Sequence, residues 1–307
     1  MISTASAIAL VAPVLFGAIA GALRLFREPE RAIDALNLYA LNIAFPALVC
    51  GGLASAELAL PSAPGFWVLV PIAFAIAVLG ARLAARAVSP TIALTIAFGN
   101  VAYLGLPVVE QALGASSVPA AALAVAIHVL VSMTAGLFLF LRFSGDRGGG
   151  RAALKRVLKQ PLLWAPLAGL ALRLLPSDAR PLVDALLTPI GRSAAPVALF
   201  LLGLYLYVHR DEVRRIDLGD AWHLLFKLVV LPAITFALAY ALRSQTLLGS
   251  AEARVLFVLS AMPAAITTFS MARDAGHGVE RVSRTIVLTT LASALTIPIA
   301  LWLASRL

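Results

Sequence analysis

The sequence predicts an all-α integral membrane protein of about ten transmembrane helices. Of its 307 residues, 61% are hydrophobic and only 13% are charged, and the mean hydropathy is +0.97. A soluble domain of this length needs far more charge to cover its surface. The apolar residues also fall in runs of about twenty, the length with which a helix crosses roughly 30 Å of hydrocarbon. We therefore expect a multi-pass protein whose main partner is the lipid bilayer.

The apolar runs define ten predicted spans. These cover residues 3–25, 32–54, 66–87, 90–112, 117–142, 160–176, 184–207, 220–243, 252–272 and 283–304. The first run has no Lys or Arg before it and is too long for the apolar core of a cleaved signal, so we expect a membrane span there. The single cysteine, Cys50, lies inside the second span, which excludes a disulfide within one chain.

Basic residues concentrate in alternate connections between these spans. Seventeen Lys and Arg residues lie in the connections after spans 1, 3, 5, 7 and 9, against five on the opposite side. Cytoplasmic connections of membrane proteins carry such an excess. The net charge of +9 therefore indicates membrane topology, and no nucleic acid partner is expected. This orientation predicts a bacterial cytoplasmic (inner) membrane protein with both termini outside, in the periplasm.

The two halves of the chain resemble each other. The similar pairs are 17–25 with 166–174, 45–48 with 195–198, and 70–75 with 231–237. Because each half has an odd number of spans, the second half enters the membrane from the opposite side, as in the inverted repeats of transporters. We therefore predict a first five-helix repeat (1–142), a cytoplasmic connection with a glycine hinge (143–159) and an inverted second repeat (160–307). Chance similarity between Leu- and Ala-rich helices is the competing explanation.

Spans 4 and 9 are interrupted by helix-breaking residues. Span 4 contains Gly99, Gly105 and Pro107, and span 9 contains Pro263, which frees the carbonyl of Leu259. Unpaired backbone in hydrocarbon costs several kcal/mol, so it persists only where protein or a water-lined cavity satisfies it. We expect the two broken helices to cross in the membrane, with helix N-termini directed at an anion. A pair of ordinary proline kinks is the alternative.

Residues around these interruptions form the predicted substrate site. Asn100, Thr267 and Thr268 offer neutral hydrogen bonds to a carboxylate. Asn42 in span 2 either lines the substrate path or forms a hydrogen bond between helices. Both roles are equally compatible with its position. The complete predicted set is Asn42, Gly99, Asn100, Tyr103, Gly105, Pro107, Met262, Pro263, Thr267 and Thr268.

Few ionisable residues lie within the predicted spans. Arg192 in span 7 is a candidate for attracting an anion, and His128 in span 5 is a candidate for proton exchange or for a structural hydrogen bond. Lys227 in span 8 is expected to snorkel to the cytoplasmic surface. The sequence contains neither H-E-x-x-H nor G-x-S-x-G, so we expect no enzymatic activity, no metal and no cofactor.

Four stretches resemble the auxin efflux carrier family. They are AFGNVAYLGLPVVEQALG (97–114), KQPLLWAPLAGLALRLL (159–175), PVALFLLGLYL (196–206) and AMPAAITTFSMARDAG (261–276). They occur in the order of the family, and the resemblance covers nearly the whole chain. It implies a bacterial member of a family of ten-helix carriers related in fold to the bile acid/sodium symporters. It further implies a scaffold from spans 1, 2, 6 and 7, a transport domain from spans 3–5 and 8–10, and a crossing at Pro107 and Pro263.

This resemblance implies a secondary transporter of a small organic anion. The expected substrate is an auxin-like monocarboxylate or a malate- or malonate-type dicarboxylate, moved by elevator-like alternating access. Sodium independence is favoured because no Asp or Glu lies at either interruption to bind Na⁺. A sodium-coupled symporter of the bile-acid type, with backbone and hydroxyl ligands, and a non-transporting membrane receptor are the alternatives. The family also implies a homodimer formed through the scaffold.

Overall fold

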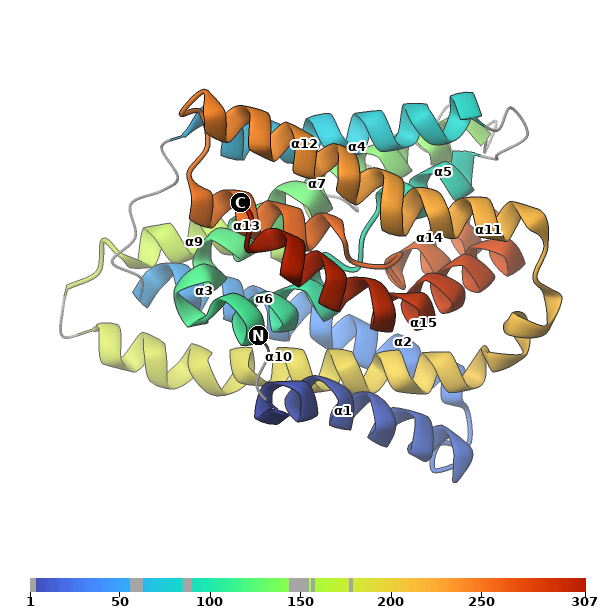
Figure 1. Cartoon of the computed structure of the whole chain (residues 1–307). Coiled ribbons are helices and arrows are strands. Elements are labelled where there is room, and N and C mark those ends of the chain that lie inside the picture. The colour runs from blue at the N-terminus through green and yellow to red at the C-terminus, as the bar shows by residue number, and fades with distance from the viewer. Residues whose placement is uncertain (1–3, 56–62, 85–89, 144–154, 156–157, 177–178) are drawn as a thin grey trace. The chain divides into compact units, whose positions relative to one another are not determined.

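A computed structural model describes residues 4–55, 63–84, 90–143, 155, 158–176 and 179–307 (Figure 1). Among these residues every regular element is a helix, which confirms the all-α prediction. The chain forms two compact units. Unit 1 comprises residues 1–60, 102–126 and 160–208, and unit 2 comprises residues 61–101, 127–159 and 209–307. The predicted glycine hinge at residues 148–150 lies outside the described part of the chain.

Several helices have the length and composition of membrane spans. Within the described residues, five are long and apolar enough to cross a membrane: Pro29–Ala54, Ala115–Ala135, Arg180–Val208, Leu218–Ser244 and Val279–Ala304. Four shorter apolar helices accompany them: Ile8–Ala22, Pro64–Gly80, Val101–Leu113 and Pro161–Leu172. These helices support a multi-pass membrane protein, whereas ten complete spans and an inverted repeat stay predictions.

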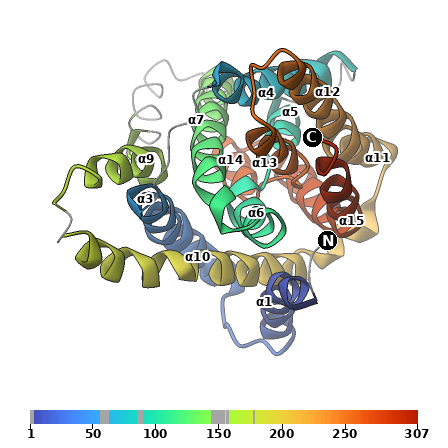
Figure 2. The same ribbon diagram turned by 60° about the vertical axis from the view of Figure 1, so that its left-hand side comes forward.

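Unit 1 is built around one long helix. Its elements are α1 (Thr4–Ala22), α2 (Pro29–Tyr39), η1 (Ala40–Ala44), α3 (Phe45–Ser55), η2 (Val101–Gly105), α6 (Leu106–Leu113), η3 (Ala115–Ser117), the start of α7 (Val118–Phe143), α9 (Pro161–Leu172) and α10 (Arg180–Val208). Helix α10 packs against α1, α2 and α3, and α3 also packs against α9 (Figure 2). Glycines bring α1 and α10 into backbone contact, since a Cβ built on Gly203 would lie 1.8 Å from the Val14 carbonyl oxygen.

Unit 2 contains the second broken helix and the C-terminal helices. Its elements are α4 (Pro64–Ala84), α5 (Pro90–Ala97), the rest of α7, η4 (Arg210–Arg215), α11 (Leu218–Leu225), η5 (Phe226–Val230), α12 (Leu231–Ser244), α13 (Ser250–Ser260), α14 (Thr267–Ala275) and α15 (Val279–Ala304). Helix α12 packs against α4 and α13, and α15 packs against α11, α13 and α14. The long helix α15 thereby joins the elements on both sides of the break between α13 and α14.

A π-helical turn precedes proline in three helices. The turns η1, η2 and η5 are followed directly by Pro46, Pro107 and Pro232, each the second residue of the next α-helix. Proline lacks an N–H, and its ring collides with the carbonyl of the preceding α-helical turn. The wider i→i+5 turn moves that carbonyl away, so the helix continues past the proline. The helices therefore continue past these prolines.

Candidate functional site

The two interrupted segments of unit 2, which follow α5 and α13, meet through their backbones. Beyond α5 and α13 the chain is extended, and Gly99 and Ala264 form an antiparallel bridge. Two hydrogen bonds close it, from Asn100 N to Pro263 O at 2.7 Å and from Ala265 N to Phe98 O at 2.9 Å. The bridge thus pairs backbone groups that the interruptions deprive of helical partners, as burial in hydrocarbon requires.

The structure places the first interruption at Gly99 and Asn100, rather than at Pro107 as the family resemblance implied. Pro107 lies within a continuous helix because η2 accommodates it. In the second broken helix the bridge does include the predicted residue, Pro263. The carbonyl of Leu259 is not free, however, because it accepts a hydrogen bond from Met262 N at 3.3 Å.

Side chains of α7 and α15 hold the bridge. Gly99 N donates to His128 Nε2 at 3.0 Å, and Ala264 N donates to Thr289 Oγ1 at 3.1 Å. Because Nε2 accepts, the proton of a neutral His128 ring lies on Nδ1. Thr289 is completely buried, and its hydroxyl donates a hydrogen bond to Thr285 O at 2.7 Å. Both side chains therefore support the backbone of the crossing, and sequence reasoning had missed Thr289.

Lys227 is buried beside this bridge, so the expectation that it snorkels to the surface is wrong. The residue is 1% exposed, and a Cβ built on Gly99 would lie 3.2 Å from its Nζ. It belongs to η5, the π turn that precedes Pro232. In the described part of the chain no carboxylate forms an ion pair with Lys227. A buried ammonium in a membrane protein requires compensation, and an anionic ligand is one source.

Asn100, which takes part in the bridge, has a side-chain hydrogen-bond donor without a partner among the described residues. The residue is 3% exposed, and its Nδ2 is buried without a partner among the described residues. A buried donor without a partner costs about 1–3 kcal/mol, which a bound acceptor would recover. Thr268 is also buried, but its hydroxyl donates to Ala265 O at 2.7 Å. Met262 is buried, and Thr267 begins α14 with its side chain half-buried.

The remaining predicted residues belong to unit 1. Tyr103 is buried, its hydroxyl donates to Asn37 Oδ1, and its ring stacks on Phe45 with a centroid distance of 5.3 Å. Asn42 donates to Leu38 O of its own helix at 2.9 Å, and Arg192 is exposed on α10. Gly105 and Pro107 are buried backbone positions. Of the predicted residues, in contrast, Gly99, Asn100 and Pro263 take part in the bridge of unit 2, and Met262 directly precedes Pro263.

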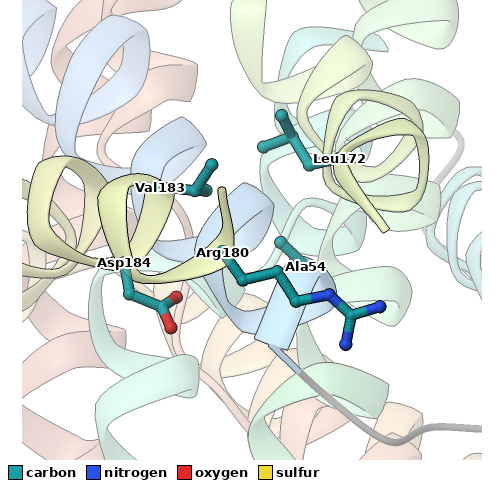
Figure 3. Close-up of a pocket in the computed structure, with 5 residues that line it drawn as sticks. All are labelled: Ala54, Leu172, Arg180, Val183 and Asp184. Atoms are coloured by element: carbon teal, nitrogen blue, oxygen red, sulfur yellow. The ribbon is translucent and has the colours of Figure 1, made fainter. Parts of the chain in front are cut away.

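Unit 1 also contains a small cavity of about 110 Å³. It lies where α3 and α9 end and α10 begins (Figure 3). Its lining residues are Ala54, Leu172, Arg180, Val183 and Asp184. Cavities that hold drug-sized ligands are several times larger, and no predicted site residue lines this one. It is therefore not the candidate substrate site.

Apolar helices of membrane-spanning length, together with interrupted segments joined beside the buried Lys227, are features found in membrane transport proteins. Residues 150–301 match the family described as "Membrane transport protein". The chain is also 26% identical over 293 residues to the "Putative malonate transporter" of Rhizobium meliloti (strain 1021), which covers 91% of this chain and 89% of that protein. Together the two similarities support a member of the auxin efflux carrier family of membrane transport proteins. Both similarities indicate a transporter rather than an enzyme.

Proposed function

We propose that this protein is a secondary transporter of a small organic anion that binds beside the bridge of unit 2. The single observation that carries this proposal is that the buried Lys227 and the unpartnered Nδ2 donor of Asn100 both lie at the bridge. A malonate-type dicarboxylate is the first candidate substrate, because the relative named as a malonate transporter covers most of the chain. An auxin-like monocarboxylate is the second.

Each part of this site has a role in holding a carboxylate. Lys227 supplies the compensating charge, and Asn100 donates a neutral hydrogen bond through Nδ2. The N-terminal end of α14, which begins at Thr267, adds the positive end of a helix dipole. Hydrogen bonds to charged groups stabilise by about 1.5–3 kcal/mol, which corresponds to roughly ten- to hundredfold in affinity.

The buried ammonium also bears on the coupling ion. A sodium ion bound beside Lys227 would experience repulsion that low dielectric strengthens. This supports sodium-independent transport over a sodium symporter of the bile-acid type.

The proposal includes an elevator-like movement in which the site travels with unit 2. Unit 1 contains the helices of predicted spans 1, 2, 6 and 7, and unit 2 contains those of spans 3 and 8–10, which supports a scaffold and a transport domain. Residues 102–126, from spans 4 and 5, group with unit 1 and depart from that division. Inverted repeats, dimerisation through the scaffold and an inner-membrane location with periplasmic termini belong to the same proposal.

Exchange of radiolabelled malonate in proteoliposomes tests the site. We expect Lys227→Met to weaken malonate binding by about a hundredfold and Asn100→Ala by about tenfold, the upper and lower ends of the range for charged hydrogen bonds. Lys159→Met, which removes an exposed lysine, is the matched control and should behave as wild type. Thermal stability should be retained in Lys227→Met, because a buried charge replaced by an apolar side chain is often neutral or stabilising.

Three outcomes would contradict parts of the proposal. Wild-type affinity in Lys227→Met would remove the site from the bridge. Binding of mono- or dicarboxylates without flux would indicate a receptor. Flux that follows an imposed sodium gradient would indicate the symporter.

A further inference from the structure

A buried ionic cluster lies where α11 and α15 of unit 2 begin, outside the proposed anion site. Its members are Asp217, Asp220, His223, Arg281, Arg284 and Thr285. Asp220 and His223 are 0% and 2% exposed, and the Arg284 side chain is 8% exposed. Charged groups at such depth are costly unless they are fully compensated, so the balance of charges and hydrogen bonds decides what the cluster does.

The cluster is neutral when His223 is neutral. Arg284 Nε lies 2.7 Å from Asp220 Oδ2, and Arg281 and Arg284 lie 3.0 and 3.3 Å from Asp217 Oδ2. The two aspartates also form a capping box at the start of α11. One acceptor is left over, because Asp220 Oδ1 is buried without a hydrogen-bond partner among the described residues. His223 Nδ1 lies 3.9 Å from this oxygen.

The hydrogen bonds of Thr285 define the state of the His223 ring. The Thr285 hydroxyl donates to Arg281 O at 2.9 Å and therefore has only lone pairs to offer His223 Nδ1, 3.4 Å away. In a neutral ring Nδ1 then carries the proton and Nε2 is basic. A second proton would make an imidazolium facing the open oxygen of Asp220. The cluster thus has a place for one more positive charge.

The cluster is connected to the bridge by two routes. Thr285 O accepts from Thr289 Oγ1, which in turn accepts from Ala264 N of the bridge. His223 also lies four residues before Lys227, which belongs to the π turn that continues the same helical segment. Two positive charges on neighbouring turns of a buried segment repel each other. An anion that neutralises Lys227 would therefore favour a proton on His223.

We propose that His223, with Asp220 as its counter-charge, binds a proton that is carried together with the anion, so that transport is anion–proton symport. This inference rests on the proposed function, because the anion is the partner that promotes protonation. The charged groups around His223 are Asp217 and Asp220 of its own segment and Arg281 and Arg284 of α15, and Lys227 follows in η5. Their charges sum to one positive charge. A bound malonate dianion would change this sum to one negative charge, which a proton on His223 would balance.

Proton movement during malonate uptake tests this inference. Proteoliposomes with a pH-sensitive dye inside, and with the membrane potential clamped, report whether protons enter with malonate. His223→Asn keeps a donor at the position of Nδ1 but does not titrate. His277→Asn, an exposed histidine in the connection between α14 and α15, is the matched control.

In wild type and His277→Asn we expect malonate to acidify the lumen. A pH difference of about one unit, acid outside, should drive about tenfold accumulation. In His223→Asn, malonate exchange at equal pH should persist while acidification and accumulation are lost. Exchange without acidification in wild type, or unchanged acidification in His223→Asn, would overturn the symport inference and leave the proposed function intact.

Two further measurements separate the remaining outcomes. If His223→Asn does not fold, calorimetry of malonate binding to wild type in two buffers of different ionisation enthalpy reports the proton uptake directly. Proton uptake with binding supports the inference, and its absence overturns it. If wild type neither binds nor exchanges any tested acid, the proposed function itself fails, and the inference fails with it.

Discussion

The α1–α10 contact of unit 1 and the bridge of unit 2 join apolar helices in opposite ways. Both helices of the first pair are continuous, and their glycines allow the backbones to touch. At the bridge, interrupted helices pair through backbone hydrogen bonds, and His128 and Thr289 accept further hydrogen bonds from the bridge backbone. A continuous helix satisfies its own backbone, so close packing is sufficient to hold it. A broken helix requires polar partners, and it is beside these partners that we propose an anion binds.

The largest effect is expected where packing alone joins the helices. Gly203→Leu places a Cβ 1.8 Å from the Val14 carbonyl oxygen, so the α1 and α10 backbones must separate. Overpacking costs 1–3 kcal/mol and occasionally more, and here backbone must move, so we expect a loss of about 3 kcal/mol or more in the free energy of unfolding. Denaturation of the purified protein in detergent measures it.

Gly52→Leu is the matched control, because a Cβ on Gly52 meets nothing within 4 Å. Equal losses in the two variants would show that the cost arises from replacing a helical glycine and not from the contact between α1 and α10.

An intermediate effect is expected where polar partners support the bridge. Thr289→Val leaves the N–H of Ala264 buried without an acceptor, at a cost of about 1–3 kcal/mol. Thr235→Val is the matched control, because that buried hydroxyl donates only to Leu231 O of its own helix. The difference between the two variants in the free energy of unfolding isolates the bond to Ala264. If the losses are the same, the bridge does not depend on Thr289.

The smallest effect is expected at the rim of the ionic cluster. The hydrogen bond from the backbone N–H of Asp220, with Arg281 and Arg284 nearby, holds the pKa of Asp217 below its ordinary value. A carboxylate with a lowered pKa stabilises the fold above its unfolded pKa, and this contribution is lost as the pH falls through the folded value. The Asp217 side chain is 43% exposed, so solvent screens the interaction.

Asp217→Asn should therefore lower the melting temperature slightly at neutral pH and not at all in strong acid. Thermal melts of wild type and variant across this pH range test the expectation. A difference that is independent of pH would show that the charge of Asp217 is not responsible.

Much of the fold follows from the sequence, whereas the direction of individual side chains does not. Apolar runs predict where helices form, and Asn100 and Pro263 are found at the bridge as expected. The same reasoning misplaced Lys227, because a helix that is apolar on all sides has no polar face to show which way a residue points. A π turn changes the helical register as well, so a regular period does not predict the direction of Lys227.

Proline has a similar ambiguity. Pro263 lies at a true interruption, whereas Pro107 follows a π turn within a helix, although both residues stand in apolar stretches. Whether proline breaks or bends a helix depends on the partners available to the freed backbone, and those lie in other parts of the chain. For the same reason, Thr289 and the cluster around His223 emerge only when α11, α13 and α15 are brought together.

Lys227 belongs to a π turn, so the direction of its side chain depends on the helical register of that turn. An α-helix advances by about 100° per residue, and a turn that holds one extra residue offsets everything beyond it by that angle. Pro232 maintains the offset because it cannot fit an ordinary turn. Pro232 lies outside the proposed site, and yet it helps to set the angle between Lys227 and the residues of α12. Losing it is expected to reorient the lysine relative to that helix without changing the residues of the proposed site.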